Sequence, residues 1–330
     1  MLISRRHGNS CSEELKVSQT KLTVLTPVFN EEQVIGHFHQ RTSAVLDGLD
    51  DVTATIVYVV DRCTDNTLEV LRGIVAADSR ARVIALSSRF GHQMSLLAGI
   101  EHSLESDAII MMDSDLQHPP ELIPQLLSQF RLGNDVVYTI RRDTEDASLL
   151  RKKAGDMFYY ALGKISQVPI NPNAADFRLI SNRVARALAG SFRERNMFLR
   201  GLFSWMGFNQ AGVEYTAEKR FAGHSKYSLT RMVKLAMAGI LSFSTKPLQL
   251  SIFVGASFAL LAFLLIVASV VKYFLVQSVP DGWTTLVVLL LLFSGIQLIV
   301  LGIMGAYVGG IYEEVKGRPH YIVEEVISHE

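Results

Sequence analysis

The chain contains very little cysteine and no excess of charge. Cys11 and Cys63 are the only cysteines in 330 residues, which is too few for a disulfide framework and fits a reducing compartment. Basic and acidic residues number 32 each, so the net charge is zero and no nucleic-acid partner is indicated. Residues 1–20 lack a continuous apolar run, so we expect a flexible tail there and no signal peptide.

Two familiar nucleotide-binding patterns are also missing. No Gly-x-Gly-x-x-Gly motif follows the first apolar run, and no Walker loop occurs anywhere in the chain. These absences disfavour dinucleotide dehydrogenases and P-loop enzymes. The sequence also shows no internal repeat and no low-complexity tract.

Hydrophobic residues make up 49% of the chain and gather near its carboxyl end. Neither 247–271 nor 282–312 contains a charged residue, and each run exceeds the roughly 20 residues that cross a bilayer core. A buried hairpin in a soluble core is the alternative, but soluble helices of this length normally carry a polar stripe. We therefore expect two transmembrane helices within residues 247–312 and a tail at 313–330.

Basic residues lie on one side of this predicted hairpin. They are Lys226, Arg231, Lys234 and Lys246 before it and Lys316 and Arg318 after it, whereas the connecting loop has only Lys272. The positive-inside rule then predicts a multi-pass protein of the inner (plasma) membrane, with residues 1–246 and both termini in the cytoplasm.

Two further segments carry apolar residues at helical spacing. Residues 228–246 place such a stripe beside Arg231 and Lys234, which favours a helix lying in the membrane interface. An ordinary amphipathic helix of the soluble domain is the alternative. Met197–Phe208 has aromatic residues that suit the headgroup zone, with a core helix as the alternative.

Residues 21–227 alternate between β-rich apolar runs and helical patterns. The apolar runs are Leu22–Val28, Thr55–Val60, Arg82–Leu86, Ala108–Met112 and Asp135–Ile140, and the helical patterns are Glu32–Leu46, Thr67–Ala77, His92–Leu104 and Pro120–Arg131. This alternation predicts an α/β domain in which helices cover both faces of a mostly parallel sheet.

Polar residues follow four consecutive predicted strands, and Asp113-Ser114-Asp115 follows the fourth. The carboxyl ends of parallel strands meet at one sheet edge, where open α/β sheets bind ligands. Two carboxylates so close together repel each other, and a divalent cation carrying a nucleoside diphosphate would relieve that repulsion. A strand that ends in an acidic turn is the alternative.

The ordered motifs PVFNEE, VVDRCTDNT, SRFGHQ, MDSDLQHPPE, DFRLIS and RFAGHSKY resemble family 2 glycosyltransferases of the dolichyl-phosphate mannose synthase type. With two carboxyl-terminal spans, the chain is most similar to bacterial polyprenyl-phosphate (bactoprenol) glucosyltransferases. The resemblance covers about residues 20–315 and implies a GT-A-like fold. Arg62 is a departure, because the family often has two acids and a glycine where this chain has Val60-Asp61-Arg62.

The resemblance also implies a role for individual residues. It places Pro27, Phe29, Glu31, Asp61, Arg89, Asp113 and Ser114 at the nucleotide sugar, with Asp61 accepting a hydrogen bond from the uracil ring. Asp115, Gln117 and Asp113 would hold Mg²⁺ or Mn²⁺, and Arg200, Arg220, Ser225 and Lys226 would bind phosphate or the lipid acceptor. Turn, capping and solvated-charge roles are the alternatives.

The implied reaction is transfer of a hexose, with inversion, from a nucleotide sugar to polyprenyl phosphate. Asp176 is expected to act as a base or to orient the sugar, with Arg178 as a catalytic partner, and a structural salt bridge is the alternative. UDP-glucose is the favoured donor, ahead of GDP-mannose and UDP-N-acetylglucosamine. A processive polysaccharide synthase, a lipid nucleotidyltransferase and a non-catalytic membrane scaffold are the rival functions.

Tyr321–Val326 has the pattern of a strand beyond the second span. It has no obvious local partner, so we expect it to pair with another subunit in a homo-oligomer.

The predicted topology can be tested by labelling. A cysteine introduced at Ser278, in the loop between the two spans, should react with an impermeant thiol reagent added to intact cells. The lysine and arginine bias places this loop outside the cytoplasm. Labelling that occurs only after lysis would reverse the topology.

Overall fold

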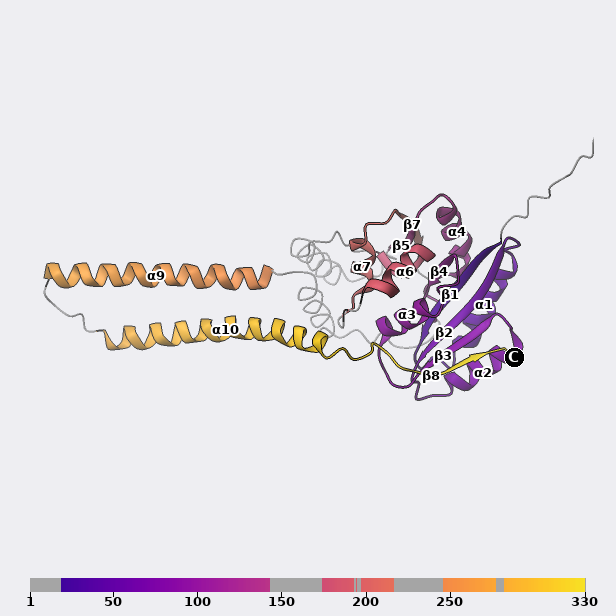
Figure 1. The fold of residues 1–330 in the computed structure, drawn as a ribbon, viewed down its shortest axis with the longest axis horizontal. Coiled ribbons are helices and arrows are strands. Elements are labelled where there is room, and N and C mark those ends of the chain that lie inside the picture. The colour runs from indigo at the N-terminus through magenta and orange to yellow at the C-terminus, as the bar shows by residue number, and fades with distance from the viewer. Residues whose placement is uncertain are drawn as a thin grey trace, which may run out of the picture.

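One eight-stranded mixed sheet organises the amino-terminal part of the protein (Figure 1). The structure is a computed structural model, and it describes residues 19–142, 174–192, 194, 197–216, 246–276 and 282–329. In order across the sheet, the strands are β7 (Gln210–Thr216), β5 (Val136–Arg142), β6 (Ala174–Ser181), β4 (Ala108–Met111), β1 (Thr20–Val28), β2 (Val52–Asp61), β3 (Ala81–Leu86) and β8 (Val323–Ser328).

Helices cover both faces of the sheet, so the predicted fold class is confirmed. One face is covered by α1 (Ile35–Asp47), α2 (Thr67–Ala77), the short 3₁₀ helix η1 (Pro120–Leu122) and α4 (Ile123–Arg131), and the other by α3 (His92–Glu101), α6 (Asn182–Ser191) and α7 (Leu199–Trp205). Val24 and Leu25 of β1 belong to opposite cores because successive strand residues point to opposite faces.

The centre of the sheet is parallel, whereas its flanks are mixed. β4, β1, β2 and β3 run parallel, as the strand–helix alternation predicts. β6 is antiparallel to β4, with Met111 opposite Arg178. The end of β4 therefore meets the beginning of β6. Asp113 lies two residues after Met111, and Asp176 lies two residues before Arg178, so the same register brings these two acids to one place.

The last strand corrects the expectation of pairing with another subunit. β8 pairs with β3 of the same chain, antiparallel, with Ile84 opposite Val326. The Ser87 backbone N–H donates to the Ile322 carbonyl at 2.9 Å, and Arg72 of α2 forms an ion pair with Glu325. The expectation is wrong because the partner, β3, is distant in the sequence, and the expectation considered only nearby residues. The homo-oligomer stays a prediction without this support.

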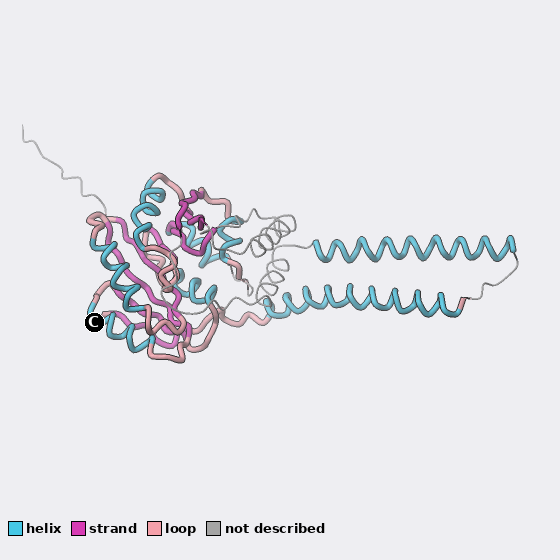
Figure 2. The backbone as a smooth tube through the Cα atoms, turned by 180° about the vertical axis from the view of Figure 1, so that it is seen from behind, coloured by secondary structure: helices cyan, strands magenta, loops and turns pink. Residues whose placement is uncertain are grey.

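Two long apolar helices extend from the domain side by side (Figures 1 and 2). These are α9 (Lys246–Val276) and α10 (Trp283–Val315), and Phe258 meets Phe293 edge to face with ring centroids 5.8 Å apart. Both are long and apolar enough to cross a membrane, through Leu248–Leu265 and Leu292–Val315. The predicted domain boundaries stay predictions, and the predicted interfacial helix lies largely outside the described residues.

The α7 region combines the two interpretations of Met197–Phe208. Leu199, Leu202 and Phe203 are buried in the core beside α3 and α6, as expected of a core helix. Trp205 is 61% exposed, and its ring meets Phe192 edge to face. Most of this helix therefore stabilises the domain.

Gly99 of α3 provides a test of this packing. A Cβ at this position would lie 2.0 Å from Cδ1 of Leu25, which is fully buried. We expect Gly99→Ala to reduce the free energy of unfolding by about 1–3 kcal/mol, the usual cost of overpacking. The matched control is Gly73→Ala in α2, where a Cβ meets nothing within 4 Å and the change should stabilise the helix by about 0.5–1 kcal/mol. Equal effects in chemical denaturation would contradict the packing.

Candidate active site at the carboxyl ends of the strands

The loops after β1 and β2 are locked together by Asn30. Its φ of 56° is left-handed, a conformation that asparagine tolerates better than most residues. Its side-chain amide donates to Thr64 Oγ1 at 2.9 Å, and its Oδ1 accepts from the Thr64 backbone N–H at 2.8 Å. The Glu31 backbone N–H donates to Thr67 Oγ1 at 2.9 Å. The backbone around Phe29 and Glu31 is thereby fixed at the sheet edge.

Two predicted nucleotide-binding residues lie against each other at the end of β1. The guanidinium carbon of Arg89 is 4.1 Å from the centroid of the Phe29 ring, which is a cation–π contact. Pro27 lies on the same strand, opposite Val59 of β2. The structure thus brings Phe29 and Arg89 together at one edge.

Asp61, at the end of β2, is buried and already bound by the protein. One carboxylate oxygen accepts from the Phe90 backbone N–H at 2.6 Å, and the other accepts from the Gly91 backbone N–H at 2.9 Å. Each oxygen keeps a second lone pair, so the role at a uracil ring stays a prediction. Asp61 also has a structural role that the sequence did not reveal, which is to hold the loop after β3. Arg62 donates to the Ser87 carbonyl at 2.5 Å.

The turn after β4 separates its residues into two alternating sets. Asp113, Asp115 and Gln117 are partly exposed, whereas Ser114, Leu116 and His118 are buried. Leu116 has a φ of 60°, a costly conformation for a branched residue. The tight turn lets Asp115 Oδ1 accept from the Gln117 backbone N–H at 3.1 Å. The three predicted metal ligands are thus all partly exposed to solvent. The predicted contact of Ser114 with the nucleotide stays a prediction.

His118 fixes this turn against β6. Its ring stacks on Phe177 with centroids 5.2 Å apart, and its Nδ1 accepts from the Asp113 backbone N–H at 3.1 Å. Because Phe177 follows Asp176, this contact ties the end of β4 to the start of β6.

Asp176 forms ion pairs with arginine side chains, so the structural salt bridge that was the alternative role for this residue is present. Arg200 of α7 contacts both of its oxygens, at 3.1 Å through Nε and 2.9 Å through Nη2, and Nη2 of the buried Arg178 is 3.9 Å away. Burial alone would raise the pKa of Asp176, but Arg200, Arg178 and His92 together hold that pKa below its ordinary value. Burial also lowers the pKa of Arg178, to about 10. At neutral pH the group is an ionised carboxylate that two guanidinium groups stabilise.

His92, the histidine of the SRFGHQ motif, lies between two carboxylates of the site, and nothing in the sequence indicated this place. Its Nε2 is 3.9 Å from Asp113 Oδ1 and 3.9 Å from Asp176 Oδ2. Arg220, Ser225 and Lys226 lie outside the described residues, so the predicted phosphate loop stays a prediction.

The donor set at the turn suits a hard divalent cation in part. Asp113 and Asp115 offer carboxylate oxygens, which Mg²⁺ and Mn²⁺ prefer. Within the described part of the chain, no group of three or more His, Cys, Asp or Glu residues forms a complete metal cage. An ion held here would need phosphate oxygens or water to complete its coordination, as Mg²⁺ with nucleotides usually does.

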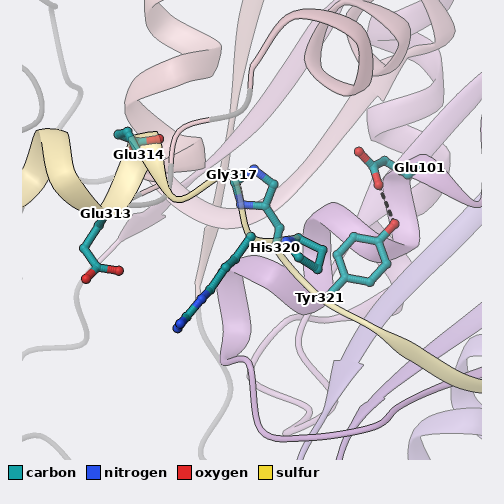
Figure 3. A pocket seen from close by; sticks show the side chains of 8 residues that line it. Glu101, Glu313, Glu314, Gly317, His320 and Tyr321 are labelled. Carbon is teal, nitrogen blue, oxygen red and sulfur yellow. Dashed lines mark hydrogen bonds between the residues drawn. The ribbon is translucent and has the colours of Figure 1, made fainter.

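A separate cavity of about 510 Å³ lies beyond the end of α10, away from the strand-end residues. Its lining is Glu101, Glu313, Glu314, Gly317, Arg318, Pro319, His320 and Tyr321. Tyr321 donates a hydrogen bond to Glu101 at the end of α3 (Figure 3). Three carboxylates make this cavity a poor place for a diphosphate, so it does not compete with the strand-end site.

Comparison with known proteins identifies the family. A model of glycosyl transferase family 2 matches residues 23–188. The chain belongs to that family. It is 38% identical over 303 residues to an uncharacterized glycosyltransferase of Bacillus subtilis, covering 92% of this chain and 93% of the relative. It is 35% identical over 305 residues to the SfII prophage-derived bactoprenol glucosyl transferase of Shigella flexneri, covering 92% and 98%.

The chain is also 34% identical over 306 residues to a prophage bactoprenol glucosyl transferase homolog of Escherichia coli, covering 93% of this chain and 99% of the relative. A solved structure of a Mycobacterium tuberculosis glucosyl-3-phosphoglycerate synthase aligns with a TM-score of 0.44 and 17% identity, over 72% and 83% of the two chains. The assignment rests on the family model and the relatives. The predicted resemblance is confirmed, and the protein is a glycosyltransferase.

The ion pair of Asp176 predicts a pH-dependent effect of Arg200. Because the folded-state pKa of Asp176 lies below the ordinary 3.8, its ionised form stabilises the fold above that pH and loses this contribution as the pH falls through the folded-state pKa. Arg200→Gln should therefore reduce stability by about 1.5–3 kcal/mol at pH 7 and by less near pH 3.

Thermal unfolding at both pH values measures this difference. Arg186→Gln is the control, because Arg186 is exposed and, within the described part of the chain, bonds only neutral groups, which are Asn182 and the Leu104 carbonyl. A loss from Arg200→Gln that does not change with pH would contradict the ion pair.

Proposed function

We propose that this protein transfers a hexose from a nucleotide sugar to polyprenyl phosphate, with inversion, at the cytoplasmic face of the membrane. The observation that carries the proposal is the meeting of two differently charged groups at one sheet edge. Asp113 and Asp115 form an acidic turn suited to a cation and diphosphate, while Asp176 lies beside Arg178 and Arg200. Relatives named bactoprenol glucosyl transferase support the lipid acceptor.

The donor would lie against the ends of β1, β2 and β4. Phe29 and Arg89 offer a ring and a guanidinium for the base, ribose or phosphates, and Glu31 is held near them by its backbone. A Mg²⁺ or Mn²⁺ ion on Asp115, with Asp113 and Gln117 beside it, would stabilise the charge of the departing nucleoside diphosphate.

The acceptor needs little help from a base. A phosphate monoester has a second pKa near 6, so polyprenyl phosphate is largely a dianion at neutral pH and is already nucleophilic. Its oxygen forms a bond to the anomeric carbon, while the bond from that carbon to the diphosphate oxygen breaks and its electron pair leaves with the diphosphate. No proton has to be removed.

This charge balance favours one of the two roles predicted for Asp176. A carboxylate whose pKa is held low by Arg200 and Arg178 is a weak base. Asp176 is better suited to orienting the sugar and the two guanidinium groups, which can then bind the acceptor phosphate. Arg220, Ser225 and Lys226 would add a basic, glycine-containing loop that closes over the phosphates.

The apolar helices suit a lipid acceptor. Removing a polyprenyl tail from the bilayer costs about 0.8 kcal/mol for each CH₂ group, so the enzyme must reach the phosphate at the membrane surface. α9 and α10 supply the anchor, and the β8–β3 pairing joins α10 to the sheet. The cytoplasmic placement of residues 1–246 belongs to the same proposal.

A single assay tests the function. The purified protein is incubated with undecaprenyl phosphate and labelled UDP-glucose, GDP-mannose or UDP-N-acetylglucosamine in parallel. We expect one labelled lipid that carries a single glucose, together with release of UDP. A polymer would indicate a processive synthase, pyrophosphate would indicate nucleotidyl transfer, and no product with any donor would favour a non-catalytic scaffold.

Asp115 provides the sharpest variant for this assay. Asp115→Asn keeps the shape of the turn but removes the charge that would hold the cation, so transfer should fall by about 100-fold or more. Asp50→Asn, at an exposed position remote from the strand ends, is the control and should be fully active. Full activity of Asp115→Asn, or of the unmodified protein in excess EDTA, would refute the metal assignment.

A further inference from the structure

The short segment from Phe90 to Gln93, at the start of α3, contacts both halves of the candidate site. Each of its four residues makes a contact: Phe90 and Gly91 on the donor side, His92 between the two sides and Gln93 on the acceptor side. Neither the sequence motifs nor the family description assigned these residues a role in the reaction.

The donor side fixes the position of this segment. Both oxygens of Asp61 accept its backbone N–H groups, from Phe90 and Gly91. Gly91 has a φ of 92°, which disfavours any residue with a side chain, and it directly precedes the first residue of α3. The start of α3 is therefore held rigidly at the end of β2.

His92 follows and lies between the two sides. A single nitrogen, Nε2, is 3.9 Å from a carboxylate oxygen of Asp113 and 3.9 Å from a carboxylate oxygen of Asp176. Without a donor between them, two carboxylates in this position repel each other. When Nε2 carries the ring proton, this N–H group lies near both carboxylates and reduces their repulsion without using either guanidinium group.

Gln93 reaches the acceptor side. Its Oε1 accepts from the Leu199 backbone N–H at 3.1 Å, at the first residue of α7. The next residue is Arg200, which contacts both oxygens of Asp176. Gln93 thus holds the helix that carries the acceptor-side cation.

We propose that His92 is a positioning residue that sets the spacing between Asp113 on the donor side and Asp176 on the acceptor side. The expected effect of His92 on kcat rests on the proposed function. His92 acts through the two carboxylates, and a displacement of about 1 Å between reacting groups can cost about 100-fold in rate.

Kinetics with His92→Ala and His92→Gln test the consequence. We expect His92→Ala to lower kcat about tenfold or more while the affinity for nucleoside diphosphate, measured by calorimetry, changes less than threefold. His92→Gln should recover most of kcat, because its amide nitrogen can reach the place of Nε2. The control is His102→Gln at the other end of the same helix, which should turn over like the unmodified protein. An unchanged kcat in His92→Ala, or a glutamine variant no better than alanine, would overturn the proposal.

A stability measurement tests the bridge that His92 forms between Asp113 and Asp176, and it does not depend on enzymatic activity. If His92 relieves the repulsion between the carboxylates, the loss of Tm caused by His92→Ala should be at least halved in the Asp176→Asn background. Equal losses in both backgrounds would overturn the bridge. If the unmodified protein makes no glycosylated lipid but this coupling is present, the proposed function fails and the bridge stands.

Discussion

The structure depends on bringing two carboxylates together at the edge of a sheet. Asp113 lies at the start of the turn after β4, and Asp176 is the third residue of β6, which runs antiparallel to β4. Two carboxylates this close together destabilise the folded state unless hydrogen-bond donors and cations surround them. His92 lies between the two groups, Arg200 and Arg178 flank Asp176, and His118 holds the backbone of Asp113.

Helix α3 connects this site with the linker that follows the second apolar helix, α10. Its first residue is His92, and its last is Glu101, which accepts a hydrogen bond from Tyr321 in the linker after α10. The linker continues into β8, which is paired with β3. A continuous set of contacts therefore extends from the second apolar helix, through Tyr321 and β8, to α3 and β3.

Much of the parallel half of the fold could be predicted from the sequence, because its signals are local. The apolar runs that became β1 to β4 are buried on both faces, and α1 and α2 bury residues at helical spacing. The direction of β6 and the partner of β8 could not be predicted, because both depend on contacts with residues distant in the chain, and an apolar run does not show which way a strand will pair.

The site shows the same division. The acidic turn at Asp113 and Asp115 was visible as a motif, since its residues are adjacent in sequence. Two other features arise only when four strand ends meet in the fold. Asp61 holds the Phe90–Gly91 backbone, and His92 lies between two carboxylates. A histidine within an ordered motif was the one available signal, and it carried no indication of its partners.

The most direct test of the account is a structure of the protein bound to a nucleoside diphosphate and Mn²⁺, with the ion located by its anomalous scattering. The account predicts one ion about 2.1 Å from a carboxylate oxygen of Asp115 and bound to the diphosphate, which lies beside Phe29 and Arg89 at the strand ends. An ion held instead among Glu101, Glu313 and Glu314, or a diphosphate bound without contact to the turn after β4, would contradict it.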